Sequence, residues 1–135
     1  MDIKELINHA KEASKLSYSP YSKYAVGAVV TTKDGKYFYG ANIENAAYPS
    51  GICAERCAVF HTYMHGYKKD ELSQLIIIAD SDSLPYPCGA CRQVISELFP
   101  LDGKIYVANF KGEYLETNIK ELLPYIFDAS NLENK

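Results

Sequence analysis

The amino-acid sequence predicts an α/β domain of three layers, in which helices cover both faces of a five-stranded mixed sheet. Segments with helical spacing of apolar residues alternate with β-rich segments along the chain, and such interleaving is typical of a mostly buried sheet. The longest strongly apolar run, residues 75–79, indicates a central strand that is covered on both faces. A length of 135 residues without repeats or low-complexity tracts predicts one domain over residues 1–135.

The individual elements follow from local patterns. Residues 1–19 have apolar side chains at helical spacing between charged ones, which predicts an amphipathic helix of the fold and not a secretory signal. Two β-rich runs, 24–32 and 37–43, flank a Lys-Asp-Gly-Lys turn and predict an antiparallel hairpin. Further helices are expected at 53–65, 88–99 and 119–123, and further strands at 75–79, 104–109 and 113–117. Ser50 is a candidate N-cap of the helix at 53–65, and Gly66 is its expected stop.

Charge and composition exclude several classes of partner. The chain has 14 basic and 17 acidic residues, and its net charge of -3 disfavours a nucleic-acid partner, which needs a concentrated basic face. No apolar run approaches the roughly 20 residues that cross a bilayer, so no membrane span is expected. Without an export signal, the expected location is cytoplasmic. In such a reducing compartment, the four cysteines favour metal binding or catalysis over disulfides.

The cysteines are spaced as ligands of a zinc ion. Cys88 and Cys91 lie three residues apart at the start of a predicted helix, where both sulfurs can reach one ion, and Cys53 is the natural third ligand. A catalytic zinc keeps one position for water, whereas a structural zinc fills all four. Cys57 could supply a fourth sulfur, so cysteine spacing alone leaves a closed structural site open as an alternative.

Glu55 favours the catalytic alternative. A carboxylate next to three thiolates is most useful as the acceptor of a proton from water. In a regular helix Glu55 would point about 200° away from Cys53, so Cys53 is expected at the non-helical start of its helix. Helix N-termini stabilise thiolates, and the guanidinium of Arg56 can donate hydrogen bonds to sulfur, which would offset the negative charge of the site.

A non-ligand Glu followed by Pro-Cys-x-x-Cys is typical of the zinc deaminases, and the chain resembles the small, homotetrameric cytidine deaminases. The resemblance extends nearly end to end and is carried by residues 20–24, 26–28, 42–48, 53–56, 87–93 and 121–124. Where related deaminases have His, this sequence has Cys53, as the tetrameric class does. Two features depart from the family pattern: Tyr24 stands where Phe is more common, and Cys57 is not required.

The resemblance implies an enzyme that hydrolyses cytidine and deoxycytidine to uridine and deoxyuridine with release of ammonia. It implies one Zn²⁺ per subunit, with Glu55 carrying protons from the attacking water to N3 and to the departing amine. It also implies that Asn42 and Glu44 bind the ribose 3′-hydroxyl, that Tyr24 lies over the pyrimidine, and that the backbone near Ala54 and Cys88 orients the base. As substrate-binding residues, Tyr48 and Phe127 are expected to reach a neighbouring subunit's site in a homotetramer.

Three competing interpretations remain at this stage. The chain could be a structural or interaction module with all four cysteines on zinc. It could also deaminate a nucleoside antibiotic such as blasticidin S, or a polynucleotide. The acidic charge balance disfavours the polynucleotide, and residues 42–48 favour a plain nucleoside over the antibiotic. Asn42 and Glu44 could instead be a polar hairpin edge, and Tyr24, Tyr48 and Phe127 ordinary strand or packing residues.

Overall fold

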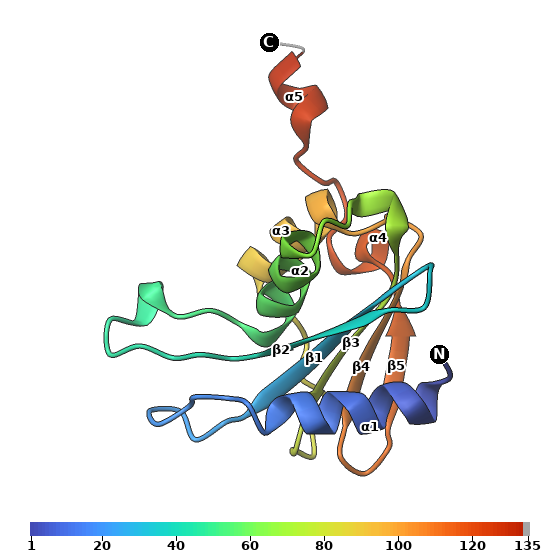
Figure 1. The fold of residues 1–135 in the computed structure, drawn as a ribbon. Helices are drawn as coiled ribbons and strands as arrows, with labels where there is room; N and C mark the ends of the chain where they lie inside the picture. Colours follow the sequence, from blue (N-terminus) through green and yellow to red (C-terminus); the bar gives the residue numbers. More distant parts are fainter. Residues whose placement is uncertain (134–135) are drawn as a thin grey trace.

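A five-stranded sheet lies between two helical layers in the computed structural model, which describes residues 1–133 (Figure 1). Its strands are β1 (Val26–Thr32), β2 (Tyr37–Ala41), β3 (Leu72–Ala79), β4 (Lys104–Asn109) and β5 (Tyr114–Thr117). They are arranged in the order β2-β1-β3-β4-β5, in which β3 and β4 run parallel and all other neighbours antiparallel. The predicted three-layer architecture, mixed sheet and central place of residues 75–79 are therefore confirmed.

Helices cover the two faces of the sheet unequally. They are α1 (Ile3–Ser14), α2 (Ala54–Met64), α3 (Gly89–Leu98), α4 (Ile119–Leu122) and α5 (Ala129–Glu133), with short 3-10 helices η1 (Tyr48–Ser50) and η2 (Lys69–Glu71). Helix α1 alone packs on one face, whereas α2, α3 and α4 pack on the other (Figure 1). None of these helices within residues 1–133 combines the length and the apolar character that a membrane crossing requires.

The central strand explains how the two layers are joined. Side chains alternate across a strand, so Ile76 and Ile78 enter the apolar cluster under α1, while Leu75 enters the cluster under α2 and α3. Both clusters are closed to solvent, which is why this segment is an uninterrupted apolar run. Ile77 faces the same side as Leu75 and forms part of the wall of a cavity at that end of the sheet.

Helix α2 lies unusually close to β2 because Gly40 has no side chain. A Cβ atom at Gly40 would lie 2.3 Å from the backbone nitrogen of Ala58 and 2.4 Å from the carbonyl oxygen of Ala54. Real Cβ atoms do not approach backbone so closely, so a side chain here would push α2 off the sheet. The position of the first turn of α2 therefore depends on this glycine.

Several predicted boundaries differ from the structure. Ser50 was predicted to be the N-cap of α2. It is instead the last residue of the separate 3-10 helix η1, which has Pro49 in its first turn, and Gly51 then returns to extended backbone. Ile52 then pairs with Ile43, and α2 begins only after Cys53. Gly66 follows the last turn of α2 with φ +91°, so the predicted stop is confirmed. The first helix ends at residue 14 and not at 19, and α5 was not predicted at all.

Candidate active site

Two helix N-termini bring three cysteines together. Cys53 is the N-cap of α2 and Cys88 is the N-cap of α3; both have extended backbone, with ψ of 155° and 167°. Cys91 follows in the first turn of α3 and is buried. The Sγ atom of Cys88 lies 3.9 Å from that of Cys53 and 3.4 Å from that of Cys91. Within residues 1–133, these three sulfurs form a group whose members all lie within 4.8 Å of one another.

The sulfur geometry fits a tetrahedral zinc ion. With Zn–S bonds of about 2.3 Å, tetrahedral angles place the sulfurs about 3.8 Å apart, which is close to the observed separations. Cys57 is outside this group, although its backbone N–H donates to the carbonyl of Cys53 over 3.0 Å. Among the residues that the structure describes, a closed site of four cysteines therefore does not form. The three thiols leave one corner of a tetrahedron without a cysteine.

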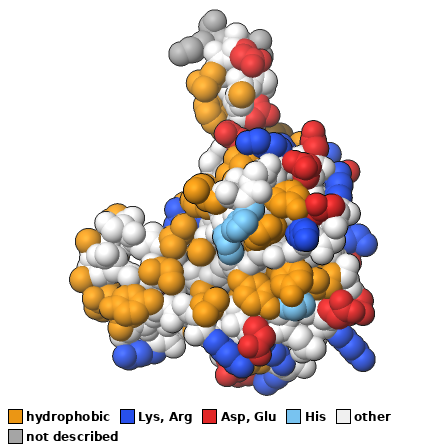
Figure 2. All heavy atoms as spheres, in the orientation of Figure 1, with side chains coloured by type: hydrophobic (Ala, Val, Ile, Leu, Met, Phe, Trp, Pro, Cys, Tyr) orange, Lys and Arg blue, Asp and Glu red, His pale blue; other side chains and the backbone are white. Residues whose placement is uncertain are grey.

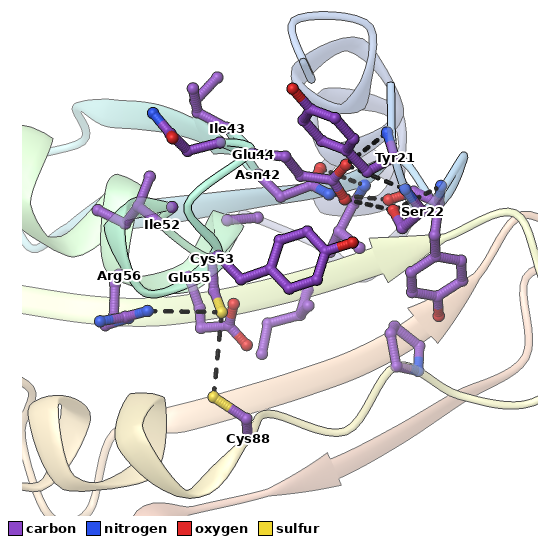
Figure 3. Close-up of a pocket in the computed structure, with 18 of the residues that line it drawn as sticks. Tyr21, Ser22, Asn42, Ile43, Glu44, Ile52, Cys53, Glu55, Arg56 and Cys88 are labelled. Carbon is purple, nitrogen blue, oxygen red and sulfur yellow. Dashed lines mark hydrogen bonds between the residues drawn. The ribbon is translucent and has the colours of Figure 1, made fainter. Parts of the chain in front are cut away.

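The surroundings of Cys53 favour its thiolate. A hydrogen bond from Cys91 and the nearby guanidinium of Arg56 lower the pKa of Cys53 to about 5, against the opposing effect of burial. The Nη2 atom of Arg56 lies 3.7 Å from the Cys53 sulfur (Figure 3). Its Nε atom is buried and has no hydrogen-bond partner in the described part of the chain. The side chain is thus held beside the sulfur cluster at the cost of one unpaired donor.

Glu55 lies in the same cavity as the sulfurs. It is the second residue of α2, and only 5% of its surface is exposed. Because Cys53 precedes the helix with extended backbone, as expected, both side chains face one side of the helix start (Figure 3). Burial is the main cause that raises the pKa of the Glu55 carboxyl to about 7. A carboxyl group that exchanges protons near neutral pH is suited to general acid and base chemistry.

The cavity has a volume of about 900 Å³, within the range of small-molecule sites. Most of the sequence-predicted site residues line it: Tyr24, Asn42, Glu44, Tyr48, Cys53, Ala54, Glu55, Arg56 and Cys88. Cys91 lies behind this lining, where it contacts Cys88. Phe127 does not line the cavity. It lies on the segment before α5, which projects away from the sheet (Figure 1), and its side chain is 58% exposed.

Asn42 and Glu44 are held in place by a polar network. The Oδ1 atom of Asn42 accepts from Ser17 Oγ at 2.5 Å and from the N–H of Val26 at 2.9 Å, and its Nδ2 donates to the carbonyl of Tyr24 at 2.8 Å. Exposed Ile43 separates the two half-buried residues, so burial alternates along this segment as it does when every second side chain shares one face. The network fixes the Asn42 amide orientation.

The carboxylate of Glu44 accepts three hydrogen bonds from one loop. The backbone N–H groups of Tyr21 and Ser22 donate over 3.0 and 3.1 Å, and the hydroxyl of Ser22 donates as well (Figure 3). The side-chain bond from Ser22 is the largest cause that lowers the pKa of Glu44. Sequence reasoning did not find this role of Ser22, although the residue lies in the segment 20–24 that carries the resemblance.

Two tyrosines stand at the rim of the cavity. The Tyr24 hydroxyl lies 3.5 Å from Ser81 Oγ, so the added oxygen that distinguishes Tyr from Phe reaches the loop after β3. Tyr48 lies in η1 with 76% of its surface exposed, and its ring meets that of Tyr21 edge-on at 6.2 Å. Pro85 and Tyr86 also line the cavity, although the sequence did not indicate them as site residues.

Known proteins are similar along nearly the whole chain. The family described as cytidine and deoxycytidylate deaminase zinc-binding region matches residues 1–108. A cytidine deaminase of Halalkalibacterium halodurans is 42% identical over 134 residues, which cover 99% of this chain and 100% of that protein. The structure is also similar to the crystal structure of a cytidine deaminase from Burkholderia pseudomallei, with a TM-score of 0.91 and 39% identity over 94% of this chain and 100% of that one.

A more distant crystal structure, a cytidine deaminase from Mycobacterium tuberculosis, has a TM-score of 0.81 and 31% identity over 95% of this chain and 98% of that one. The range that matches the family, residues 1–108, includes Cys53, Cys88 and Cys91, which the fold brings together. The chain therefore belongs to the cytidine and deoxycytidylate deaminase zinc-binding family.

Proposed function

We propose that this protein hydrolyses cytidine and deoxycytidine to uridine and deoxyuridine, with release of ammonia. The observation that carries the proposal is the buried carboxyl group of Glu55, which shares a cavity with three sulfurs spaced for zinc. Full-length similarity to proteins named cytidine deaminase supports the same reaction.

Cys53, Cys88 and Cys91 would hold the zinc ion, which when bound supplies a Lewis acid that makes water a stronger acid near neutral pH. Glu55 takes one proton from the attacking water and passes it to N3 of the pyrimidine. Once the water oxygen is bonded to C4, Glu55 carries the second proton of that oxygen to the amine, which leaves C4 as ammonia. Its burial keeps bulk water from competing for these protons. Arg56 offsets part of the negative charge of the three thiolates through its contact with Cys53.

The hydrogen-bonding capacity left on Asn42 and Glu44 matches one sugar hydroxyl. Asn42 uses both lone pairs of Oδ1 and one N–H of Nδ2, so one N–H remains. Glu44 accepts three bonds, which leaves one of its roughly four acceptor sites. A hydroxyl group both accepts and donates, so the 3′-hydroxyl satisfies both residues. A 2′-hydroxyl is not required for this contact, which supports deoxycytidine as a second substrate.

The remaining contacts concern the base and the neighbouring subunit. The ring of Tyr24 would stack on the pyrimidine, and the backbone of Ala54, at the first turn of α2, would orient it. We infer a homotetramer in which Tyr48 and Phe127 complete a neighbour's site. Tyr48 is exposed at the cavity rim and Phe127 is exposed on a projecting segment, which supports this assembly.

Because all four cysteines are unpaired thiols in the structure, we infer a reducing, cytoplasmic setting.

An ultraviolet assay of purified protein with one zinc per chain tests the substrate class. Cytidine and deoxycytidine are expected to be converted with comparable kcat/KM, and cytosine, which lacks the sugar contacts of Asn42 and Glu44, far more slowly. Turnover of none of these compounds by zinc-loaded protein, or equal turnover of free cytosine, would contradict the proposal. Light scattering tests the tetramer.

A further inference from the structure

Two histidines lie one turn apart at the end of α2, opposite to the end that carries Glu55. His61 is in the last turn of the helix and His65 is its C-cap. Both side chains are exposed, and their ring centroids are 4.8 Å apart with planes at 64°. Residues four apart on a helix share one face, so the two imidazoles can reach one ligand.

The hydrogen bonds of these rings fix which nitrogen carries the proton. The Nδ1 atom of His61 lies 2.9 Å from the carbonyl oxygen of Tyr39, and that of His65 lies 3.0 Å from the carbonyl oxygen of His61. A carbonyl oxygen only accepts, so both Nδ1 atoms are donors. In the neutral rings the lone pair is therefore on Nε2. Neither Nε2 atom has a hydrogen-bond partner within residues 1–133.

This is the arrangement in which histidine binds metals. Metal-ligating histidines commonly donate their other ring N–H to a backbone carbonyl, which fixes the tautomer and the ring orientation. Here the ring of Phe38 further restricts the imidazoles, because its centroid lies 5.4 Å from that of His61 and 4.7 Å from that of His65. The C-terminal end of a helix also favours a positive charge. Figure 2 shows His side chains open to solvent among hydrophobic ones on this side of the molecule.

We propose that His61 and His65 form a surface site for one divalent transition-metal cation of the class that prefers imidazole ligands, such as Zn²⁺, Cu²⁺ or Ni²⁺. Water completes its coordination shell. His61 lies eight positions after Cys53 along α2, a rise of about 12 Å, so the site is separate from the sulfur cluster. A cation bridging two turns would tie the end of α2 and raise the melting temperature of the protein.

The test is a calorimetric titration of untagged, zinc-loaded protein with Ni²⁺, combined with thermal unfolding. We expect one Ni²⁺ per chain and an increased melting temperature. His61→Gln and His65→Gln should each abolish both effects. His9→Gln is the matched control: His9 is the one histidine of the sequence besides His61 and His65, lies on α1, and has its Nδ1 atom 2.6 Å from the Tyr39 hydroxyl. This variant should bind Ni²⁺ as the unchanged protein does.

Three results would overturn the proposal. The first is that folded, zinc-loaded protein binds no Ni²⁺. The second is undiminished binding by the double variant His61→Gln, His65→Gln. The third is release of one zinc per Ni²⁺ bound, measured by elemental analysis, because this would assign the binding to the cysteines. None of these readouts depends on deaminase activity.

Discussion

Cys53 and Cys88 occupy the same place in two different helices: each is an N-cap, and their Sγ atoms lie 3.9 Å apart. The extended backbone of each cysteine directs its sulfur out of the helix it begins, into the space between α2 and α3 (Figure 3). The positive ends of both helix dipoles then point at the sulfur cluster, where they stabilise thiolates. The chemistry of the site thus depends on where two helices begin.

Cys57 and Cys91 are expected to respond in opposite ways to replacement by serine. Cys57→Ser should retain one zinc per chain and most of kcat, because Cys57 lies outside the sulfur group. Cys91→Ser should lose zinc and activity, because its buried thiol contacts Cys88. Elemental analysis of both purified variants provides the measurement. Zinc loss from Cys57→Ser would instead support a closed, four-cysteine site.

Arg56→Gln should lower kcat while the protein stays folded. Its guanidinium is held 3.7 Å from the Cys53 sulfur, and substitution leaves the charge of the thiolates less compensated. Replacing a partner that supports a metal ligand typically costs about 10- to 100-fold in metal affinity or activity. Steady-state kinetics at saturating zinc test this, with Arg56→Lys as the variant that keeps a positive charge. An unchanged kcat in Arg56→Gln would show that the charge of Arg56 does not contribute to catalysis.

Tyr24→Ala should raise KM for cytidine, whereas Tyr24→Phe should leave it nearly unchanged. Stacking of a base on an aromatic ring contributes about 1–3 kcal/mol, which corresponds to roughly 5- to 150-fold in KM. The Phe variant keeps the ring and loses only the 3.5 Å contact with Ser81. Kinetics of the two variants in parallel separate the ring from the hydroxyl. Equal KM values in both would show that the ring makes no contact with the base.

Ser22→Ala should shift the acid limb of the pH profile of uridine binding to higher pH. Binding of the product is measured because the acid limb of kcat/KM also reports Glu55, whose pKa is about 7. Ser22 provides the largest contribution that keeps the pKa of Glu44 below its ordinary value, so its removal raises this pKa. A carboxyl group with a lowered folded-state pKa stabilises the protein above its unfolded pKa, and this stability is lost as pH falls through the folded pKa. Binding of the nucleoside, if it needs the Glu44 carboxylate, should likewise be lost at a higher pH in Ser22→Ala than in the unchanged protein.

The control for this shift is Glu44→Gln, which has no group to titrate at this position. Adding Ser22→Ala to Glu44→Gln should leave the acid limb where it is. The zinc content is measured at each pH, so that loss of metal is not mistaken for protonation of Glu44. A limb that moves equally in both backgrounds would assign the titration to another group.

The sequence predicted the architecture well because apolar periodicity directly reflects which faces are buried. Residues 75–79 form the core of β3, and every predicted helix and strand has a counterpart in the structure. The failures were local. Ser50 was a chemically reasonable N-cap, but Pro49 and Gly51 redirect the backbone before the helix begins.

Site residues could be predicted from the sequence where their type and spacing are typical of a metal ligand or an acid–base group. A residue that only positions another side chain was missed. Cys53, Glu55 and Cys88 stand out by type and spacing, and the structure brings them to one cavity. Ser22 is an ordinary loop serine in sequence, and only the folded position of Glu44 reveals its contact. Phe127 lies on a segment that does not cover the cavity of its own chain. Its predicted contact with a neighbouring subunit's site therefore stays a prediction.

The most direct test of the proposed mechanism is the turnover number of Glu55→Gln with its zinc content measured in the same preparation. Gln keeps the size of the buried side chain and can form hydrogen bonds, but its amide neither accepts nor releases a proton at neutral pH. The variant is expected to be folded, to contain one zinc per chain, and to lose most of kcat, since general acid and base catalysis contributes about 10²- to 10⁴-fold. A zinc-loaded Glu55→Gln protein with a near-native turnover number would contradict the account.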